Sequence, residues 1–477
     1  MPGLNVQLWI ISPEIWMALI ASAVLLLDLV IKKKSLLAYM SILGAFVALY
    51  MLFQNQGSAF SGMFVADGYG TFFKMIFLIS LILTVLASMR YLPIERMEHG
   101  EYYALMLFAT IGMMTMASAS DLIMVYLGLE LMSLSVYVLA GFKRTSARSS
   151  EAALKYFLLG AFASAFLLLG ISFTYGLTGT TNIAGVASYI TRNGLTSNPV
   201  LLLATILYVA AFGFKIAAVP FHMWAPDVYE GAPTPITAFM SVGPKAAGFA
   251  VMGRVLLVAL SSMSYEWTGL LIALSILSMA AGNIIAIAQT NIKRMLAYSS
   301  IAHAGYALIG VIAGGAEGLA SMMNYLLIYT FMNIGAFTVV TLMRTEGVKA
   351  EDLTEYEGLS KTHPLLAGLM LIFMFSLTGI PPTAGFVGKF YIFVAAVNAG
   401  YTWLTVIAVI MSAISAYFYL RVVMYMYMRE PAIEHRMSDA PAARVAVLLA
   451  GIAVLLIGVL PGNVIEMART AIMGFGG

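Results

Sequence analysis

Fourteen apolar stretches, each long enough to cross a lipid bilayer as a helix, constrain the fold of this chain more than any other feature. A spanning helix needs roughly 20 mostly apolar residues, because no water is available there to hydrogen-bond the backbone. The stretches lie at 8–31, 35–53, 69–90, 102–119, 122–142, 153–177, 200–220, 236–259, 268–289, 295–313, 319–343, 364–398, 402–428 and 443–461. The twelfth is interrupted at Pro381 and Pro382. The sequence therefore predicts an all-α polytopic membrane protein with about 14 transmembrane helices.

The basic residues of the loops predict the orientation of these helices. When the loops are assigned alternately to two sides, 16 basic residues fall on one side, and only Arg192 and Arg469 fall on the other. The 16 are Lys32, Lys33, Lys34, Arg90, Arg96, Lys143, Arg144, Arg148, Lys293, Arg294, Arg344, Lys349, Lys361, Arg429, Arg436 and Arg444. The side richer in Lys and Arg normally faces the cytoplasm. We therefore expect both termini on the outer side.

The composition excludes several classes of function. Only 10% of the residues are charged, against about 25% in soluble domains, and no stretch is long enough for a soluble domain. The absence of cysteine excludes disulfides and Cys-ligated iron–sulfur clusters. No dinucleotide or Walker motif and no histidine pair with metal-ligand spacing is present. We expect a single membrane domain over residues 1–477, without a bound cofactor, a metal or a nucleic-acid partner.

Five ionisable residues lie inside the predicted spans and away from their ends: Glu130, Lys155, Lys215, Lys245 and Lys389. A charge at mid-membrane depth costs several kcal/mol, so it is normally paired, hydrated or functional. Two further charges lie nearer to the end of a span: Lys74 and Arg254. Desolvation makes a lysine easier to deprotonate, whereas an arginine keeps its proton. Four lysines at such positions favour proton transfer over fixed ion pairing.

Two of the five have simple alternative interpretations. Glu130 marks an ion pathway or satisfies one local polar group. Lys155 follows Glu151 by four residues, so the two can form an ion pair on one helix face at the membrane interface. Lys215 and Lys245 have no acidic neighbour in the sequence, and they require a partner or water from another helix.

Two of the lysines accompany proline breaks. In "FGFKIAAVPFHMWAPD" Lys215 precedes Pro220, and in "LTGIPPTAGFVGKFYIF" Lys389 follows two prolines. Broken helices are tolerated at membrane depth only where they are buried in protein or line a cavity, and in transporters they mark the ion site. The breaks fall in helices 7 and 12, which predicts two inverted five-helix repeats. The predicted segments are residues 1–101 with three helices, 102–260 and 261–428 as the repeats, and 429–477 with the last helix.

Histidine supplies one further candidate. His303 is the only ionisable residue inside the tenth span, and imidazole titrates near neutrality, which suits a proton relay between the lysines. The alternative is a packing residue that donates to a carbonyl. His222 follows Pro220, where a loop or cap role and a proton-entry role are both open.

The stretch "FKIAAVPFHMWAPDVYEGAPTPITAFMSVGPKAA", residues 214–247, resembles the signature of a known family. This family comprises the proton-translocating antiporter-like subunits of respiratory complex I and of multi-subunit cation/proton antiporters. The resemblance extends from about Tyr102 to Arg429. "SSIAHAGYALIG", "NYLLIYTFMNIGAF" and "LTGIPPTAGFVGKFYIF" are similar to one bacterial complex I paralogue in particular. Lys389 stands where another paralogue carries a glutamate.

The resemblance implies a role for each candidate residue. Glu130 would pair with Lys215, Lys245 would be a bridging lysine, Lys389 the terminal lysine, Lys155 an auxiliary lysine, and His303 a connector. It further implies that NADH, FMN, iron–sulfur clusters and quinone belong to other subunits. The implied partners are the other membrane subunits of complex I, including antiporter-like paralogues, in the lipid bilayer of a bacterial inner membrane.

Three functions are compatible with these features. In the first, quinone reduction elsewhere draws Glu130 away from Lys215, and the proton passes through Lys245 and His303 to Lys389. In the second, the same residues exchange protons for Na⁺, although few hard-cation ligands besides Glu130 lie at mid-depth. In the third, the chain is a scaffold without an ion path. Five mid-membrane ionisable residues argue against a scaffold.

Overall fold

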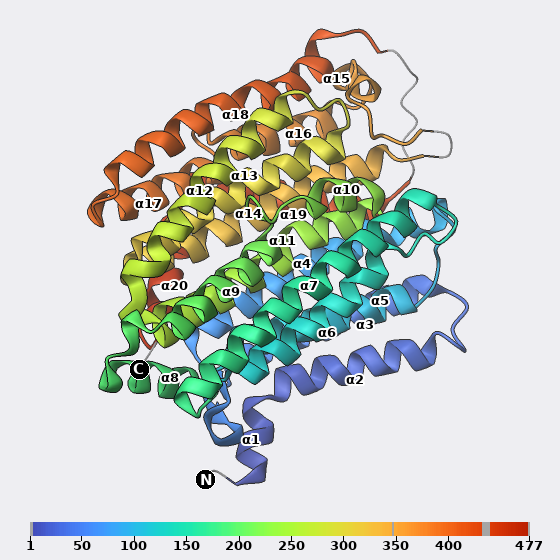
Figure 1. The fold of residues 1–477 in the computed structure, drawn as a ribbon. Coiled ribbons are helices and arrows are strands. Elements are labelled where there is room, and N and C mark those ends of the chain that lie inside the picture. The colour runs from blue at the N-terminus through green and yellow to red at the C-terminus, as the bar shows by residue number, and fades with distance from the viewer. Residues whose placement is uncertain (1–2, 346–347, 432–438, 476–477) are drawn as a thin grey trace.

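The computed structural model describes residues 3–345, 348–431 and 439–475. Long helices run roughly side by side through the molecule, as Figure 1 shows. Within the described residues, eleven are long and apolar enough to cross a membrane. They are α3 (Lys34–Leu52), α4 (Gly68–Ile94), α6 (Leu122–Ala140), α7 (Ala147–Thr178), α9 (Pro199–Ile216), α11 (Thr234–Arg254), α12 (Ser264–Ile287), α13 (Ile292–Ala313), α14 (Gly315–Met343), α18 (Thr402–Met428) and α19 (Pro441–Val459).

Three further spans complete the predicted set. Two of them are the single helices α2 (Ser12–Leu27) and α5 (Glu101–Ser118). The third is the interrupted twelfth span, which consists of α16 (Pro364–Thr378) and α17 (Ala384–Asn398). Every stretch predicted to span therefore contains a helix or a broken helix pair. This confirms an all-α multi-pass membrane protein.

The remaining elements are short. They are the helices α1 (Leu4–Ile10), α8 (Ile183–Asn193), α10 (Trp224–Gly231), α15 (Leu359–Thr362) and α20 (Gly462–Ile472), and the antiparallel strands β1 (Gly57–Ala59) and β2 (Phe64–Ala66). A π-helical segment, Val255–Ala259, continues α11, and 3-10 turns lie at 60–62, 195–197, 261–263 and 353–356. Both α8 and α20 bury one stripe of residues at helical spacing, as helices that lie across the end of a bundle do.

Burial divides the helices into a centre and a periphery. The apolar windows of α11, α13 and α14 are 89%, 94% and 94% buried, whereas those of α3, α7, α18 and α19 are 28–39% buried. A helix in the centre of a bundle is covered by other helices on every face, while a helix at the edge leaves part of its surface open to lipid. The centre of the bundle is therefore formed by α11, α13 and α14.

Both described ends of the chain lie at the same end of the bundle in Figure 1, as an even number of spans requires. The opposite end carries ion pairs between residues of the short helices and connections there, including Arg429 with Glu357 and Lys361 with Glu430. Arg436, one of the predicted loop residues, lies outside the described residues.

Candidate functional site

The two helix breaks share one local design. Helices α9 and α16 each end in a residue with left-handed backbone, Ala217 (φ 58°) and Gly379 (φ 93°). The amide after each of these residues donates to the carbonyl five positions earlier, at 2.8 and 3.0 Å. Three residues beyond the left-handed residue, the peptide bonds before Pro220 and Pro382 are cis. Both predicted breaks are thus confirmed, and both stop a helix inside a span.

Lys215 lies in the last turn of α9 and is only 2% exposed. Its Nζ donates to Ser133 Oγ at 2.7 Å and to Tyr137 OH at 3.4 Å. Both partners lie on α6, three and seven residues after Glu130, so all three occupy one face of that helix. The lysine is therefore held by hydroxyl groups on the face that carries the acid.

Glu130 lies near Lys215 but does not pair with it directly. Oε1 of this carboxylate is buried, and it accepts no hydrogen bond from the described part of the chain. Glu130 precedes Ser133, which binds Lys215, by about one turn of α6. No ion pair within 4 Å joins the two among the described residues, and Ser133 holds the ammonium instead. The pairing implied by the resemblance is thus an indirect contact in this structure.

Lys155 lies on α7 in a salt-bridge network at the surface. Its Nζ is 2.7 Å from Glu151 and 3.0 Å from Asp227, and the side chain is 42% exposed. Asp227 also accepts from Arg294 at 2.7 Å. Burial alone would raise the pKa of the Asp227 carboxyl, but the hydrogen bonds from Arg294 and Lys155 hold it below its ordinary value. The predicted pair with Glu151 is present.

A simple prediction follows for Lys155. Exposed ion pairs contribute little, and water replaces them readily. Proton transport by the intact complex should therefore change by less than about twofold in Lys155→Ala. A loss as large as that caused by replacing buried Lys215 would instead place Lys155 in the proton pathway itself.

Lys245 lies on α11, at the centre of the bundle, and is 3% exposed. Its Nζ donates to the carbonyl oxygen of Ser300 at 2.8 Å and to Ser300 Oγ at 2.9 Å. The ring of Tyr229 lies 5.9 Å from the ammonium. No carboxylate pairs with Lys245 within the described residues, so its charge is compensated only by dipoles.

His303 is bonded at both ring nitrogens. On α13, its Nδ1 lies 2.6 Å from Tyr325 OH and its Nε2 lies 3.1 Å from Tyr419 OH. Tyr419 OH is 2.5 Å from Ser299 Oγ, next in the chain to the Ser300 that binds Lys245. This yields a bonded sequence of Ser299, Tyr419, His303 and Tyr325. Such groups can both donate and accept protons.

Lys389 binds the carbonyl groups at the second helix break. It lies on α17, and its Nζ donates to the carbonyl oxygens of Leu377 at 3.1 Å and Thr378 at 2.8 Å, and to Ser412 Oγ at 2.8 Å. The two carbonyls belong to the last turn of α16, where no intrahelical partner remains. A cation is favourable there because the helix dipole is negative at that end. The broken helix therefore supplies the site that the lysine occupies.

Lys245 binds Ser300, which precedes His303 by three residues on α13. The ring of Tyr306 lies 5.8 Å from the His303 ring and 4.8 Å from Lys389 Nζ. The structure thus brings three predicted residues together at the centre of the bundle. Lys215 and Glu130 form a second group between α6 and α9, and Lys155 lies apart from both groups. Sequence reasoning missed the hydroxyl partners of these lysines, which are Ser133, Tyr137, Ser300 and Ser412. It also missed Tyr325 and Tyr419, the hydroxyl partners of His303.

One basic residue that the sequence pattern assigns to a connection between spans is buried. The sequence pattern places Lys293 in a loop, but it is 2% exposed in the first turn of α13. Its Nζ donates to the carbonyl oxygens of Glu230 and Ala232, both at 2.7 Å. These carbonyls end α10, so Lys293 is buried because it satisfies the end of the short helix after the first break.

The charges near the span ends are paired. Lys74 lies 2.6 Å from Glu14. Arg254 lies 2.7 Å from Asp67, and its Nε donates to the carbonyl of Ala117 at 2.8 Å. These pairs join helices, and they account for both charges without an ion path.

Comparison with known proteins places these features in a family. Residues 119–415 match the family model "NADH:quinone oxidoreductase/Mrp antiporter, TM". The chain is 50% identical over 475 residues to NADH-quinone oxidoreductase subunit N of Trichlorobacter lovleyi, covering 98% of this chain and 97% of that protein. It is also 50% identical over 469 residues to NADH-quinone oxidoreductase subunit N 2 of Rhizobium meliloti, covering 97% of each.

Solved structures show the same fold. A chain of respiratory complex I from Thermus thermophilus matches with a TM-score of 0.82 and 36% identity, over 96% of this chain and 99% of that one. A chain of the Mrp complex from a Dietzia species matches with a TM-score of 0.84 and 22% identity, over 99% and 98%. At 22% identity the second match indicates a shared fold only.

Proposed function

Since the chain belongs to the subunit N family of NADH-quinone oxidoreductases, we propose that it moves protons across the membrane through its buried lysines, driven by quinone reduction in other subunits. The observation that carries this proposal is that Lys215, Lys245 and Lys389 are all buried and are held by hydroxyls and carbonyls. A lysine without a carboxylate in contact can lose its proton at moderate cost. Fixed structural charges, such as Arg254, have acidic partners instead.

The proposed sequence of events begins at Glu130. While its carboxylate is near Lys215, the attraction favours the protonated lysine. Movement of α6 or α9 that separates the two removes this attraction, and Lys215 releases its proton. The proton passes through Lys245 and His303 to Lys389, from which it leaves the membrane. Each pKa unit of change corresponds to about 1.4 kcal/mol. The Coulomb energy between two charges in a low-dielectric interior is large enough to supply a change of this size.

The hydroxyl groups around His303 offer a physical route for the central step. Ser300 touches Lys245, and its neighbour Ser299 begins the bonded sequence through Tyr419 to His303. Each hydroxyl can accept a proton on one side and donate another on the other side. Bridging waters would complete the path where side chains are not in direct contact.

Tyr419→Phe tests this route. The change removes the hydroxyl between Ser299 and His303 and keeps the ring. We expect proton transport to fall by about tenfold, less than the 10²–10⁴-fold typical of a positioned acid–base group, because a water can replace a hydroxyl. The control is Tyr417→Phe on the same helix, since Tyr417 is 61% exposed. Equal rates in both variants would exclude Tyr419 from the path.

We also propose that residues 102–260 and 261–428 are inverted repeats, flanked by an N-terminal segment of residues 1–101 and a C-terminal segment of residues 429–477. The equal spacing from the left-handed residue to the proline in both breaks supports this. The proposed location is a bacterial inner membrane with both termini outside. NADH, FMN, iron–sulfur clusters and quinone are proposed to bind other subunits, and the proposed partners are the other membrane subunits of the complex.

The second candidate function is cation/proton exchange, because the family model that matches the chain also describes the Mrp antiporter. Purification of the protein from its native membrane separates the two candidates. Recovery with flavin and iron–sulfur subunits and NADH-driven proton pumping support the redox complex. Transport that depends on a sodium gradient and needs no redox subunits would support the exchanger.

A further inference from the structure

A pocket of about 1100 Å³ opens among α2, α5 and α6, at the end of the bundle away from the termini. Residues of these helices, of the connections after α4 and α6, and of the segment after α14 line it. We refer to it as the α2–α5 pocket. It lies outside the lysine groups described above, and none of the proposed proton-carrying residues lines it.

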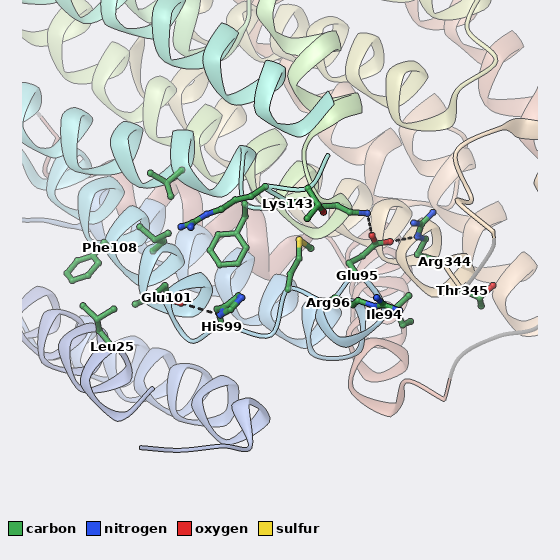
Figure 2. A pocket seen from close by; sticks show the side chains of 17 residues that line it. Leu25, Ile94, Glu95, Arg96, His99, Glu101, Phe108, Lys143, Arg344 and Thr345 are labelled. Carbon is green, nitrogen blue, oxygen red and sulfur yellow. Dashed lines mark hydrogen bonds and ion pairs between the residues drawn. The ribbon is translucent and has the colours of Figure 1, made fainter. Parts of the chain in front are cut away.

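The residues that line the α2–α5 pocket carry an excess of positive charge. The basic residues that line it are Arg96, Lys143, Arg144 and Arg344, and the carboxylates are Glu95 and Glu101. Glu95 accepts hydrogen bonds from both Lys143 and Arg344, as Figure 2 shows. Burial would raise the pKa of Glu95, but these two bonds hold it below its ordinary value, so the group stays ionised at neutral pH.

Arg96 and Arg144 are therefore the cations free to bind a ligand. Both are exposed, and neither has a carboxylate partner within the described residues. Arg96 also has a left-handed backbone, with φ 57°. This conformation is unfavourable for a residue with a side chain, and such strain tends to persist at functional sites.

One wall of the α2–α5 pocket is apolar. Figure 2 shows Leu25 and Phe108 close together, far from Glu95 and Arg344. Phe108 lies seven residues into α5 from Glu101, which places it about 10 Å deeper along the helix axis. Leu25 and Val138, which also line the pocket, remain 42% and 53% exposed. The pocket thus combines charged residues with an apolar wall formed by Leu25, Phe108 and Val138.

We propose that the α2–α5 pocket binds an anionic phospholipid. Arg96 and Arg144 hold the phosphate of the headgroup through charge-assisted hydrogen bonds, and an acyl chain lies along Leu25, Phe108 and Val138. Basic pockets between transmembrane helices on the cytoplasmic side are suited to anionic headgroups. A soluble anion has no apolar part that could contact the apolar wall. A zwitterionic lipid would leave the excess positive charge uncompensated.

Photo-crosslinking of the intact purified complex tests the proposal. The probe is phosphatidylglycerol with a photoactivatable acyl chain, and the labelled peptides are mapped by mass spectrometry. We expect label on α5 and α6, near Phe108 and Val138. Unlabelled phosphatidylglycerol should compete with the probe, whereas phosphatidylcholine and inorganic phosphate should not.

Two variants separate the headgroup contacts from the apolar wall. Arg96→Ala/Arg144→Ala should weaken the competable labelling by about thirtyfold, since each basic residue near an anionic lipid contributes about fivefold. Val138→Trp keeps all charges and should reduce the label by filling the space beside the apolar wall. The control Lys32→Ala/Lys33→Ala removes two exposed basic residues that do not line the pocket, and it should label as the unmodified complex does.

Several results would overturn the proposal. Equal labelling by a phosphatidylcholine probe would show that charge plays no part. Competition by inorganic phosphate would identify a site for soluble anions. Undiminished labelling in both the double arginine variant and Val138→Trp would place the lipid elsewhere. A helix of another subunit crosslinked at Val138 in place of lipid would show that a protein covers the pocket.

Discussion

Lys215→Ala in the intact complex should reduce NADH-driven proton pumping by about a hundredfold or more, the scale expected when a positioned proton carrier is lost. The lysine is buried in the last turn of α9, and only Ser133 and Tyr137 hold its ammonium. Alanine removes the ammonium that donates to these hydroxyls, so no group at this position can carry the proton. The measurement is the quenching of a pH-sensitive dye in proteoliposomes that contain the complex.

Two further variants show whether this result reflects the relay. Glu130→Ala should also slow pumping, because the attraction that favours protonated Lys215 is removed. Lys32→Ala, an exposed loop lysine, is the matched control and should pump normally. Near-normal pumping in both Lys215→Ala and Glu130→Ala would rule out the relay.

Asp67→Ala should destabilise the protein by about 3–5 kcal/mol, since it leaves a buried arginine without its carboxylate. Asp67 lies 2.7 Å from Arg254, whose side chain is only 6% exposed. Asp67 also accepts from the Gly70 amide at 2.7 Å and so caps the start of α4. The expected observation is a lower thermal denaturation midpoint and less assembled complex.

The double variant Asp67→Ala/Arg254→Met shows whether the unpaired charge causes this loss. Methionine removes the buried charge and keeps much of the volume, so stability should recover in part. The control is Asp439→Ala, since Asp439 is 89% exposed where it faces Arg444. An Asp67→Ala protein as stable as this control would show that the buried pair contributes nothing.

The fold was predictable because it depends on short-range patterns. Each span is a run of apolar residues along the chain, and each break is a proline that removes a backbone donor. For the same reason Lys215 and Lys389 stood out as charges in apolar runs beside prolines. The left-handed residue before Pro220 is an alanine, so no glycine marked where α9 stops.

The surroundings of the lysines were not predictable, because they arise from contacts between distant parts of the chain. Ser133 lies 82 positions from Lys215, and Ser300 lies 55 positions from Lys245. Serines and tyrosines inside apolar helices have no pattern that distinguishes a lysine partner from an ordinary packing residue. The burial of Lys293 was unpredictable for the same reason, since the carbonyls that bury it are more than 60 positions away.

Proton pumping by Lys215→Arg tests the central claim most directly. Arginine keeps the positive charge at the end of α9 but does not give up its proton at physiological pH. If Lys215 works by releasing a proton, the arginine variant should lose pumping as completely as Lys215→Ala. Pumping at the unmodified rate in Lys215→Arg would contradict the relay, because a fixed charge at this position would then be sufficient.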